Sequence, residues 1–130
     1  MAMPVRFPIR FTGANHAMAL LGIVPQHCRV EIDDGEVRVR MSWAFHLDAP
    51  RARLRRVEPD NAPVYGWGAH GWRGRWLVNG SSSGLVRMEF DPPVRGYTTG
   101  FPVRVRVLRV SVDDPDGLVA ALRRAPLDQH

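Results

Sequence analysis

The sequence predicts one small domain that is mainly β and ends in a short α-helix. Three observations predict this class: apolar and polar residues alternate along much of the chain, turn sequences interrupt these runs, and an amphipathic segment follows near the C-terminus. A length of 130 residues, with 45% hydrophobic and 24% charged residues, is typical of a single globular domain. We therefore expect one domain over residues 1–130, with an N-terminal segment at 1–26, strands within 27–112 and a helix at 114–125.

The strictest alternation surrounds the turn sequence Asp34-Gly35 and predicts a β-hairpin. A two-residue type I′ turn at this point would align the two strands in one register. Three apolar pairs would then share the inner face: Cys28 with Met41, Val30 with Val39, and Ile32 with Val37. The outer face carries charged or polar side chains, as in an antiparallel sheet with one wet side: Arg29, Glu31, Arg38, Arg40 and His46.

Further strands follow this hairpin. Residues 51–57 alternate as a short strand with Ala52 inward. Residues 72–78 and 86–90 also alternate, and the turn sequence Asn79-Gly80 lies between them. These two segments therefore predict a second hairpin.

The end of the chain predicts a bulged strand and then a helix. In residues 103–112 the apolar parity changes near Leu108, which indicates a β-bulge. Asp114 suits an N-cap and Pro115 the first helical position. Three apolar residues then form one stripe of the helix: Leu118, Val119 and Leu122. A second short helix is expected at residues 15–21.

Three segments carry a family resemblance: residues 48–54, the sequence Gly66-Trp67-Gly68, and residues 110–122, in which a strand runs directly into the Asp-Pro-capped helix. Together, over roughly residues 28–125, they resemble the bacterial pleckstrin-homology-like (PH-like) domains. The resemblance implies a bent, partly open antiparallel barrel of about seven strands, closed at one end by the C-terminal helix. It also implies a scaffold of which several members form homo-oligomers. The chain lacks the lysine-rich loop of lipid-binding relatives, so phosphoinositide binding is not expected.

Two glycine motifs match catalytic patterns but lack their structural context. Residues 66–71 match G-x-G-x-x-G and residues 80–84 match G-x-S-x-G, yet both chemistries need a helix immediately afterwards. Strand patterns follow instead. The five histidines show no metal-ligand spacing, and Cys28 is the only cysteine, placed on the apolar parity. We therefore expect no enzyme, no cofactor and no metal site.

The positive charge of the chain comes from arginine alone. All 18 basic residues are arginine, and the net charge is +5. Guanidinium groups suit carboxylates and phosphates, so an arginine surface can serve anionic ligands. A GC-rich genome produces the same composition without a functional reason, and this alternative stays open.

The candidate binding segment is residues 65–76, which combine aromatic rings, a histidine and guanidinium groups. Its candidate partner- or ligand-binding residues are Trp67, His70, Trp72, Arg73 and Arg75. Such mixtures occur at protein interfaces and on single-stranded nucleic acid platforms. The alternative is that the tryptophans fold back over the barrel mouth while the arginines stay in water.

The sequence favours a non-catalytic interaction module that self-associates or binds a protein partner. Self-association is expected if valines of residues 103–112 are exposed as an apolar patch. The alternative is a binder of an anionic ligand, either nucleic acid or a phosphorylated small molecule, through outward-facing arginines.

A cytoplasmic location is expected. The lone cysteine fits a reducing compartment. The apolar run at residues 17–24 is too short to span a bilayer, and no cleavage site follows it.

Overall fold

The computed structural model describes residues 5–10, 28–42, 44–61, 68–72, 74–79 and 83–124, of which 68–72 are described by their backbone. Nine strands form one sheet: β1 (Val5–Pro8), β2 (Cys28–Ile32), β3 (Glu36–Met41), β4 (Phe45–Pro50), β5 (Leu54–Pro59), β6 (Gly68–Trp72), β7 (Arg75–Asn79), β8 (Leu85–Thr98) and β9 (Phe101–Ser111). The 3₁₀ turn η3 (Arg51–Arg53) precedes β5, and the helix α1 (Pro115–Arg123) follows β9.

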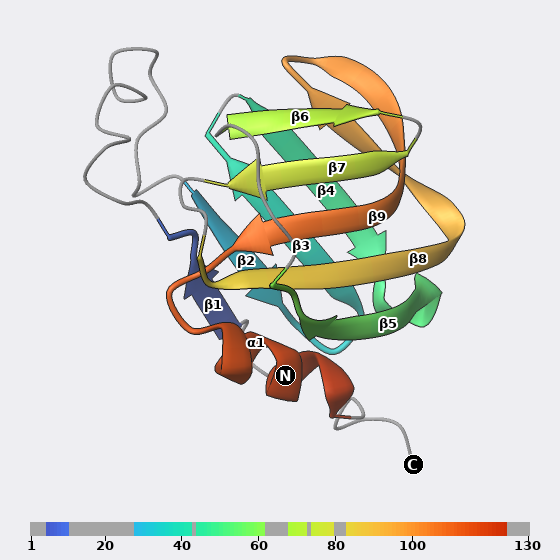
Figure 1. Cartoon of the computed structure of the whole chain (residues 1–130). Coiled ribbons are helices and arrows are strands. Elements are labelled where there is room, and N and C mark those ends of the chain that lie inside the picture. The colour runs from blue at the N-terminus through green and yellow to red at the C-terminus, as the bar shows by residue number, and fades with distance from the viewer. Residues whose placement is uncertain are drawn as a thin grey trace.

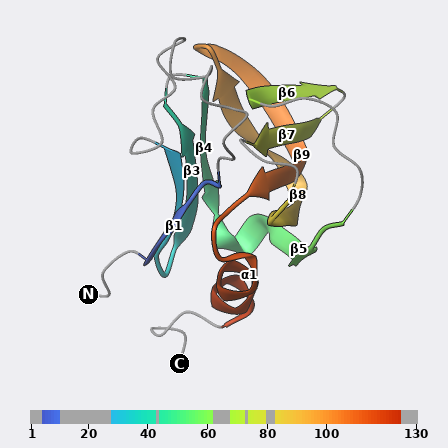
Figure 2. The same ribbon diagram turned by 60° about the vertical axis from the view of Figure 1, so that its left-hand side comes forward.

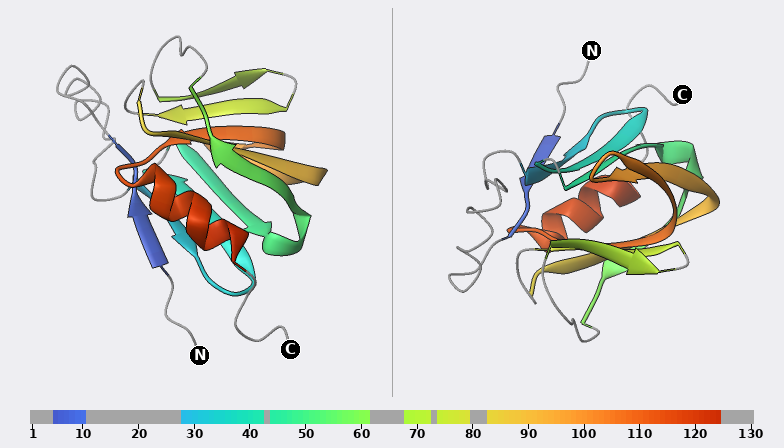
Figure 3. Two further views of the ribbon diagram at one scale, coloured as in Figure 1. Left: turned by 60° about the horizontal axis from the view of Figure 1, so that its bottom comes forward. Right: turned by 90° about the horizontal axis from the view of Figure 1, so that it is seen from above.

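The sheet is curled into a partly open barrel. Its strand order is β1-β2-β3-β4-β8-β9-β7-β6, and β5 pairs with β8. Strands β1 to β4 form one layer, and β5 to β9 form the layer that faces it (Figures 1 and 2). The long strand β8 joins the layers, because one part of it pairs with β4 and another with β5. Helix α1 lies across one end (Figure 3), so the expected mainly β barrel with a helical cap is confirmed.

The β2–β3 hairpin has the register that the alternation predicts. Its three inner pairs are those expected, and all six side chains are buried. The predicted type I′ turn is wrong, because neither Asp34 nor Gly35 has the positive φ that this turn requires. Instead, the Asp33 carboxylate accepts the backbone N–H of Gly35 at 2.9 Å and that of Glu36 at 2.8 Å. An aspartate side chain therefore closes the turn.

The strand predicted at residues 51–57 begins later than expected. Residues 51–53 form η3, so β5 starts at Leu54 and Ala52 is exposed. The backbone N–H of Arg51 donates to the Gly35 carbonyl at 3.0 Å. This contact with the first hairpin fixes the chain direction after β4, and local alternation does not reveal it.

The prediction of the second hairpin, between residues 72–78 and 86–90, is wrong. Gly74 has a φ of +81°, a left-handed conformation that glycine adopts without strain, and Trp72 lies opposite Arg75. The expected single strand is therefore the hairpin β6–β7. Strand β7 then pairs in parallel with β9 instead of β8. The alternation identifies the inner face of β7. This face stays the same whether β7 pairs with β8 or with β9, so alternation does not decide between them.

Strands β8 and β9 pair in two stretches separated by an irregularity. Glu89 lies opposite Val107 and Val94 opposite Val105, so residues 90–93 of β8 oppose Arg106. The N–H groups of Arg106 and Val107 both donate to the Gly74 carbonyl, at 2.7 and 3.1 Å. The predicted change of parity is confirmed just before Leu108, but the extra residues belong to β8.

The apolar residues of the predicted patch at residues 103–112 are covered on both faces of the strand. Val103 is half-buried, and the remaining apolar residues of the predicted patch are buried: Val105, Val107, Leu108, Val110 and Val112. The exposed valines on which self-association was expected are therefore not found. The curled sheet covers the apolar side chains on one face of the strand. The change of parity turns the remaining apolar side chains inward.

Helix α1 begins and packs as predicted, and it ends at Arg123. The Asp114 carboxylate accepts the N–H of Gly117 at 3.0 Å, and Pro115 occupies the first turn. Leu118, Val119 and Leu122 are buried in one hydrophobic cluster shared with the strands. The short helix expected at residues 15–21 lies outside the described residues.

Candidate functional site

The structure describes only part of the binding segment predicted at residues 65–76. Trp67 and Arg73 lie outside the described residues. His70 and Trp72 are placed by their backbone in β6, at the edge of the sheet. The side chains of these four residues thus lie outside the described part of the chain.

Two further residues of this segment turn to opposite faces of β7. Arg75 has an exposed side chain. Trp76 is half-buried and packs against the core, with its ring centroid 5.9 Å from that of Phe45. For Trp76, the packing alternative is therefore the observed one.

Strands occupy the positions where the glycine motifs would need helices. Strand β6 begins within residues 66–71, and β8 follows residues 80–84. A pyrophosphate site and a nucleophile elbow both need a helix N-terminus at these positions. The backbone therefore does not support either chemistry.

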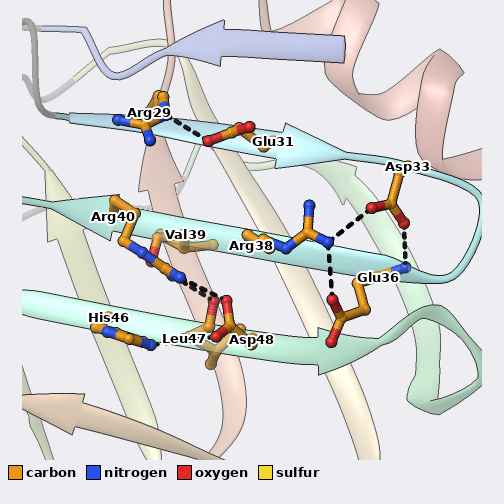
Figure 4. Close-up of polar contacts among 10 residues, drawn as sticks. All are labelled: Arg29, Glu31, Asp33, Glu36, Arg38, Val39, Arg40, His46, Leu47 and Asp48. Carbon is orange, nitrogen blue, oxygen red and sulfur yellow. Dashed lines mark hydrogen bonds and ion pairs between the residues drawn. The ribbon is translucent and has the colours of Figure 1, made fainter. Parts of the chain in front are cut away.

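The outer face of β2, β3 and β4 carries arginines that are matched by carboxylates (Figure 4). Arg38 lies 2.8 Å from Asp33 and 2.9 Å from Glu36. Arg40 lies 2.8 Å from Asp48 and also donates to the Leu47 carbonyl. The guanidinium groups of this face are thus balanced within the chain.

These contacts lower the pKa of the carboxylates concerned. The pKa of Glu31 is lowered chiefly by the hydrogen bond from Arg29. Burial raises the pKa of Asp33, but hydrogen bonds from two backbone N–H groups and from Arg38 outweigh it and lower the pKa overall. Burial also raises the pKa of Asp48, but the hydrogen bond and the charge of Arg40 are the main effects that lower it overall. All three stay ionised at neutral pH.

Three pairs of arginines face each other across neighbouring strands of the sheet. They are Arg29 with Arg40, Arg87 with Arg109, and Arg95 with Arg104. Like charges at directly opposite positions destabilise a sheet unless something compensates them.

Local carboxylates balance two of these three pairs. Glu31 and Asp48 serve the first, while Glu89 and Asp60 serve the second. Among the described residues, no carboxylate forms an ion pair with Arg95 or Arg104. This uncompensated pair distinguishes one region of the outer face.

Arg95 and Arg104 line a groove of about 440 Å³. Its described lining residues include no acidic side chain: Arg53, Pro93, Val94, Arg95, Pro102, Val103 and Arg104. The irregular pairing of β8 with β9 lies next to the groove, because residues 90–93 have no regular partner on β9 and one of them, Pro93, belongs to the lining. Arg53 donates to the Pro93 carbonyl at 3.4 Å. The groove therefore combines three exposed arginines with proline and valine residues.

Two more exposed arginines continue this charge along the neighbouring strands. Arg106 follows Arg104 on β9, and its N–H donates to the Gly74 carbonyl, one residue before Arg75 on β7. Neither side chain is ion-paired within the described part of the chain. Arg75, the predicted site residue whose side chain is described, lies close in the sheet to this region. We call Arg53, Arg75, Arg95, Arg104 and Arg106 the arginine face.

A second cavity, of about 380 Å³, lies between β5 and α1. Its lining includes Glu58, and Arg123 already donates two hydrogen bonds to the Val57 carbonyl. This cavity therefore has mixed charge and a guanidinium engaged in holding the helix.

The remaining reactive groups form no site in the described part of the chain. Burial raises the pKa of the Cys28 thiol to about 11, so the thiol stays protonated at neutral pH. The described residues contain no cluster of three or more His, Cys, Asp or Glu side chains that could ligate a metal ion. No described helix has the length and apolar character needed to cross a membrane.

Comparison with protein-family models, with curated proteins and with solved structures finds no match for this chain. The geometry of the arginine face is therefore the basis on which we infer a function.

The sequence analysis did not identify this groove. A signal was present in the alternating stretch Val103-Arg104-Val105-Arg106, which places guanidinium groups outward. Alternation cannot show, however, which arginines will meet a carboxylate. That depends on pairing between strands that are distant in the sequence.

Proposed function

We propose that this chain is a non-catalytic, cytoplasmic binding domain of the PH-like class that binds an anionic ligand at the arginine face. The observation that carries the proposal is the facing pair Arg95 and Arg104. Equivalent pairs elsewhere in the sheet are compensated by carboxylates of the chain itself. An anion bound between Arg95 and Arg104 would supply the missing compensation.

The chemistry of the groove suits phosphate or a similar oxyanion. Guanidinium groups donate paired hydrogen bonds in a fixed plane, which matches phosphate oxygens. Three such groups surround one groove, and none of its described lining residues repels an anion. Its volume of about 440 Å³ lies within the range of small-molecule sites.

We favour anion binding over self-association. Self-association was expected from exposed valines at residues 103–112, and most of these side chains are buried. The apolar residues at 105–112 are buried, so they cannot provide the exposed patch on which self-association was expected. The arginine face, in contrast, is exposed and uncompensated within the described chain.

The test is calorimetric titration of the full chain with inorganic tripolyphosphate at low and at moderate salt. We expect binding whose affinity falls steeply with salt, because phosphate contacts release counterions. The double variant Arg95→Gln/Arg104→Gln should weaken binding about tenfold or more, since hydrogen bonds to charged groups contribute about 1.5–3 kcal/mol each.

The matched control is Arg55→Gln/Arg124→Gln, which removes the same charge from exposed positions outside the groove. We expect this control to change the affinity much less. Equal losses in the two double variants would show that only net charge matters and would contradict a site at the groove.

A further inference from the structure

The hairpin that joins β8 to β9 projects beyond the core at the end of the barrel opposite α1 (Figures 1 and 2). The exposure of its inner face rises toward the tip: Val105 is 0% exposed, Val103 is half-buried and Phe101 is 70% exposed. These three residues share one face of β9 because they alternate along the strand. A Cβ added at Gly100, at the tip, would meet no atom within 4 Å. The tip therefore stands in open space.

Hydrogen bonds hold this tip in one conformation. Thr98 pairs with Phe101 across the hairpin. The backbone N–H of Thr99 donates to the Ala44 carbonyl at 3.1 Å, and the Thr98 hydroxyl donates to the same carbonyl at 3.2 Å. Thr99 has a φ of +48°, a left-handed conformation that β-branched residues rarely adopt. The tip is thus fixed at its base to the start of β4, and the paired strands present Phe101 to its surroundings.

Arginines occupy the opposite face of the same hairpin. Arg95 and Arg104 face each other across β8 and β9, three residue pairs from the tip pair of Thr98 with Phe101. At the rise of an extended strand, this places them about 10 Å along the hairpin from Phe101. Residues 92–112 contain no aspartate and no glutamate. The hairpin therefore combines an exposed aromatic tip with a cationic section behind it.

A small ligand in the arginine groove does not reach Phe101, because the ring and the two guanidinium groups lie on opposite faces of the hairpin. An extended surface that receives the whole tip contacts both faces at once. The surface of an anionic bilayer has this form, since acyl chains that accept an aromatic ring lie beneath a layer of phosphate headgroups. Amphipathic segments at such surfaces enter this boundary by about 5–10 Å. This depth matches the separation between Phe101 and the arginine pair.

From these observations we infer that the anionic ligand is the headgroup surface of an anionic phospholipid bilayer, into which the β8–β9 hairpin inserts Phe101 while Arg95 and Arg104 contact phosphates. This inference rests on the proposed function and specifies its ligand. Long arginine stems can lie along apolar surface while the guanidinium groups stay at the level of the headgroups. Tyr97, two residues from Arg95 on the outer face, is 37% exposed and has the amphipathic ring that is enriched at this boundary.

Other anionic partners explain less of this hairpin. A soluble phosphate or a nucleic acid would use the arginines and leave Phe101 in water, although burial of a phenylalanine ring is favourable. An acidic protein partner would need an apolar centre at its interface. The exposed large hydrophobic side chains of the described hairpin, Phe101 and Tyr97, lie on opposite faces and form no contiguous patch.

The experiment measures co-sedimentation of the full chain with sucrose-loaded vesicles, made of phosphatidylcholine alone or of phosphatidylcholine mixed with phosphatidylserine. We expect binding to the mixed vesicles that weakens as salt rises, and much weaker binding to the neutral ones. Arg95→Gln/Arg104→Gln should weaken binding to the mixed vesicles about tenfold or more, because each arginine near an anionic surface contributes to binding. The control Arg55→Gln/Arg124→Gln, which removes the same charge elsewhere, should change it much less.

Phe101→Ala should weaken binding to the mixed vesicles about tenfold at either salt concentration, because burial of the ring does not involve counterions. The same variant should leave the affinity for tripolyphosphate unchanged, and Phe101→Trp should keep vesicle binding. Val5→Ala is the matched control, since Val5 is also exposed but lies on β1, outside the hairpin. Circular dichroism of each variant verifies the fold, which truncation of an exposed side chain should preserve.

The outcomes separate this inference from the proposed function. Vesicle binding that Phe101→Ala leaves unchanged would overturn insertion of the hairpin while the groove arginines keep their role. Binding of tripolyphosphate or of a single-stranded oligonucleotide, without binding of the mixed vesicles, would assign a soluble anion and overturn the inference alone. Failure of tripolyphosphate to bind would remove the proposed function and, with it, this inference.

Discussion

The carboxylate of Asp33 links the backbone turn of the first hairpin to its outer charges. It accepts two backbone N–H groups of the turn and pairs with Arg38 on β3. Burial raises the pKa of the Asp33 carboxyl group. The hydrogen bonds and the charge of Arg38 lower this pKa by more, so the folded-state pKa lies below the ordinary value. Folding is therefore linked to the ionised form of Asp33.

We expect Asp33 to contribute stability at neutral pH that is lost in acid. Because its folded-state pKa is depressed, the contribution is present above the unfolded pKa, about 4, and disappears as pH falls through the folded-state value. The Asp33→Asn variant should be less stable at pH 7, and its thermal midpoint should fall less between neutral and acidic pH. Thermal denaturation across this pH range is the measurement.

The neighbouring turn residue supplies the control for this prediction. Asp34→Asn changes the same charge within the same turn, and no ion pair involves Asp34 among the described residues. We expect its pH dependence to follow the wild type. Parallel pH curves for wild type and Asp33→Asn would refute the linkage.

At the scale of elements, helix α1 is held at its C-terminal end by Arg51 of η3. The Nη2 atom of Arg51 donates to the carbonyls of Ala121, Leu122 and Arg124, at 3.3, 3.4 and 2.8 Å. Its Nη1 atom donates to the Asp33 carbonyl at 3.1 Å. The last carbonyls of a helix lack intrahelical partners and carry partial negative charge, so a guanidinium suits this position. One side chain thus connects the helix to the first hairpin.

We expect Arg51→Met to reduce the free energy of unfolding by about 1.5–3 kcal/mol, the size of hydrogen bonds to a charged group. Methionine keeps the apolar stem, so the loss reports mainly the guanidinium. Arg55→Met is the control, because Arg55 is exposed and its recorded hydrogen bond goes to the nearby Ala52 carbonyl. Chemical denaturation midpoints give the comparison, and equal midpoints for the two variants would exclude the capping role.

At the scale of the whole molecule, β8 determines the shape. Its 14 residues pair with β9 along both stretches, with β5 over one part and with β4 over another. The irregularity at residues 90–93 lies between these parts. The sheet can therefore curl around the core (Figure 1). The same irregularity lies beside the arginine groove on the outside.

We expect the protein to be monomeric at micromolar concentration, because the apolar residues at 105–112 are buried. This expectation replaces the association that an exposed apolar stripe would have favoured. Sedimentation velocity at several salt concentrations is the measurement. A stable dimer would show that another surface, such as the edge strands β1 or β6, mediates association.

The sequence alone determined the inner faces of β2, β3 and β4, the register of the first hairpin and the start of the helix. These features depend on neighbours along the chain: alternation sets which residues point inward, a short turn links β2 to β3, and Asp114 caps a helix within three residues. The sequence also named Arg75 as a candidate binding residue, but local alternation could not locate the groove.

Only the tertiary structure decided that β7 pairs with β9, that residues 51–53 form η3, and that β8 carries the extra residues. Alternation specifies a face and leaves the neighbouring strand open, so either pairing satisfied the sequence of β7. The candidate site has the same origin. Whether an arginine is neutralised depends on carboxylates brought close by long-range pairing, as Asp60 is to Arg109, and this pairing leaves Arg95 facing Arg104 without a compensating carboxylate in the described chain.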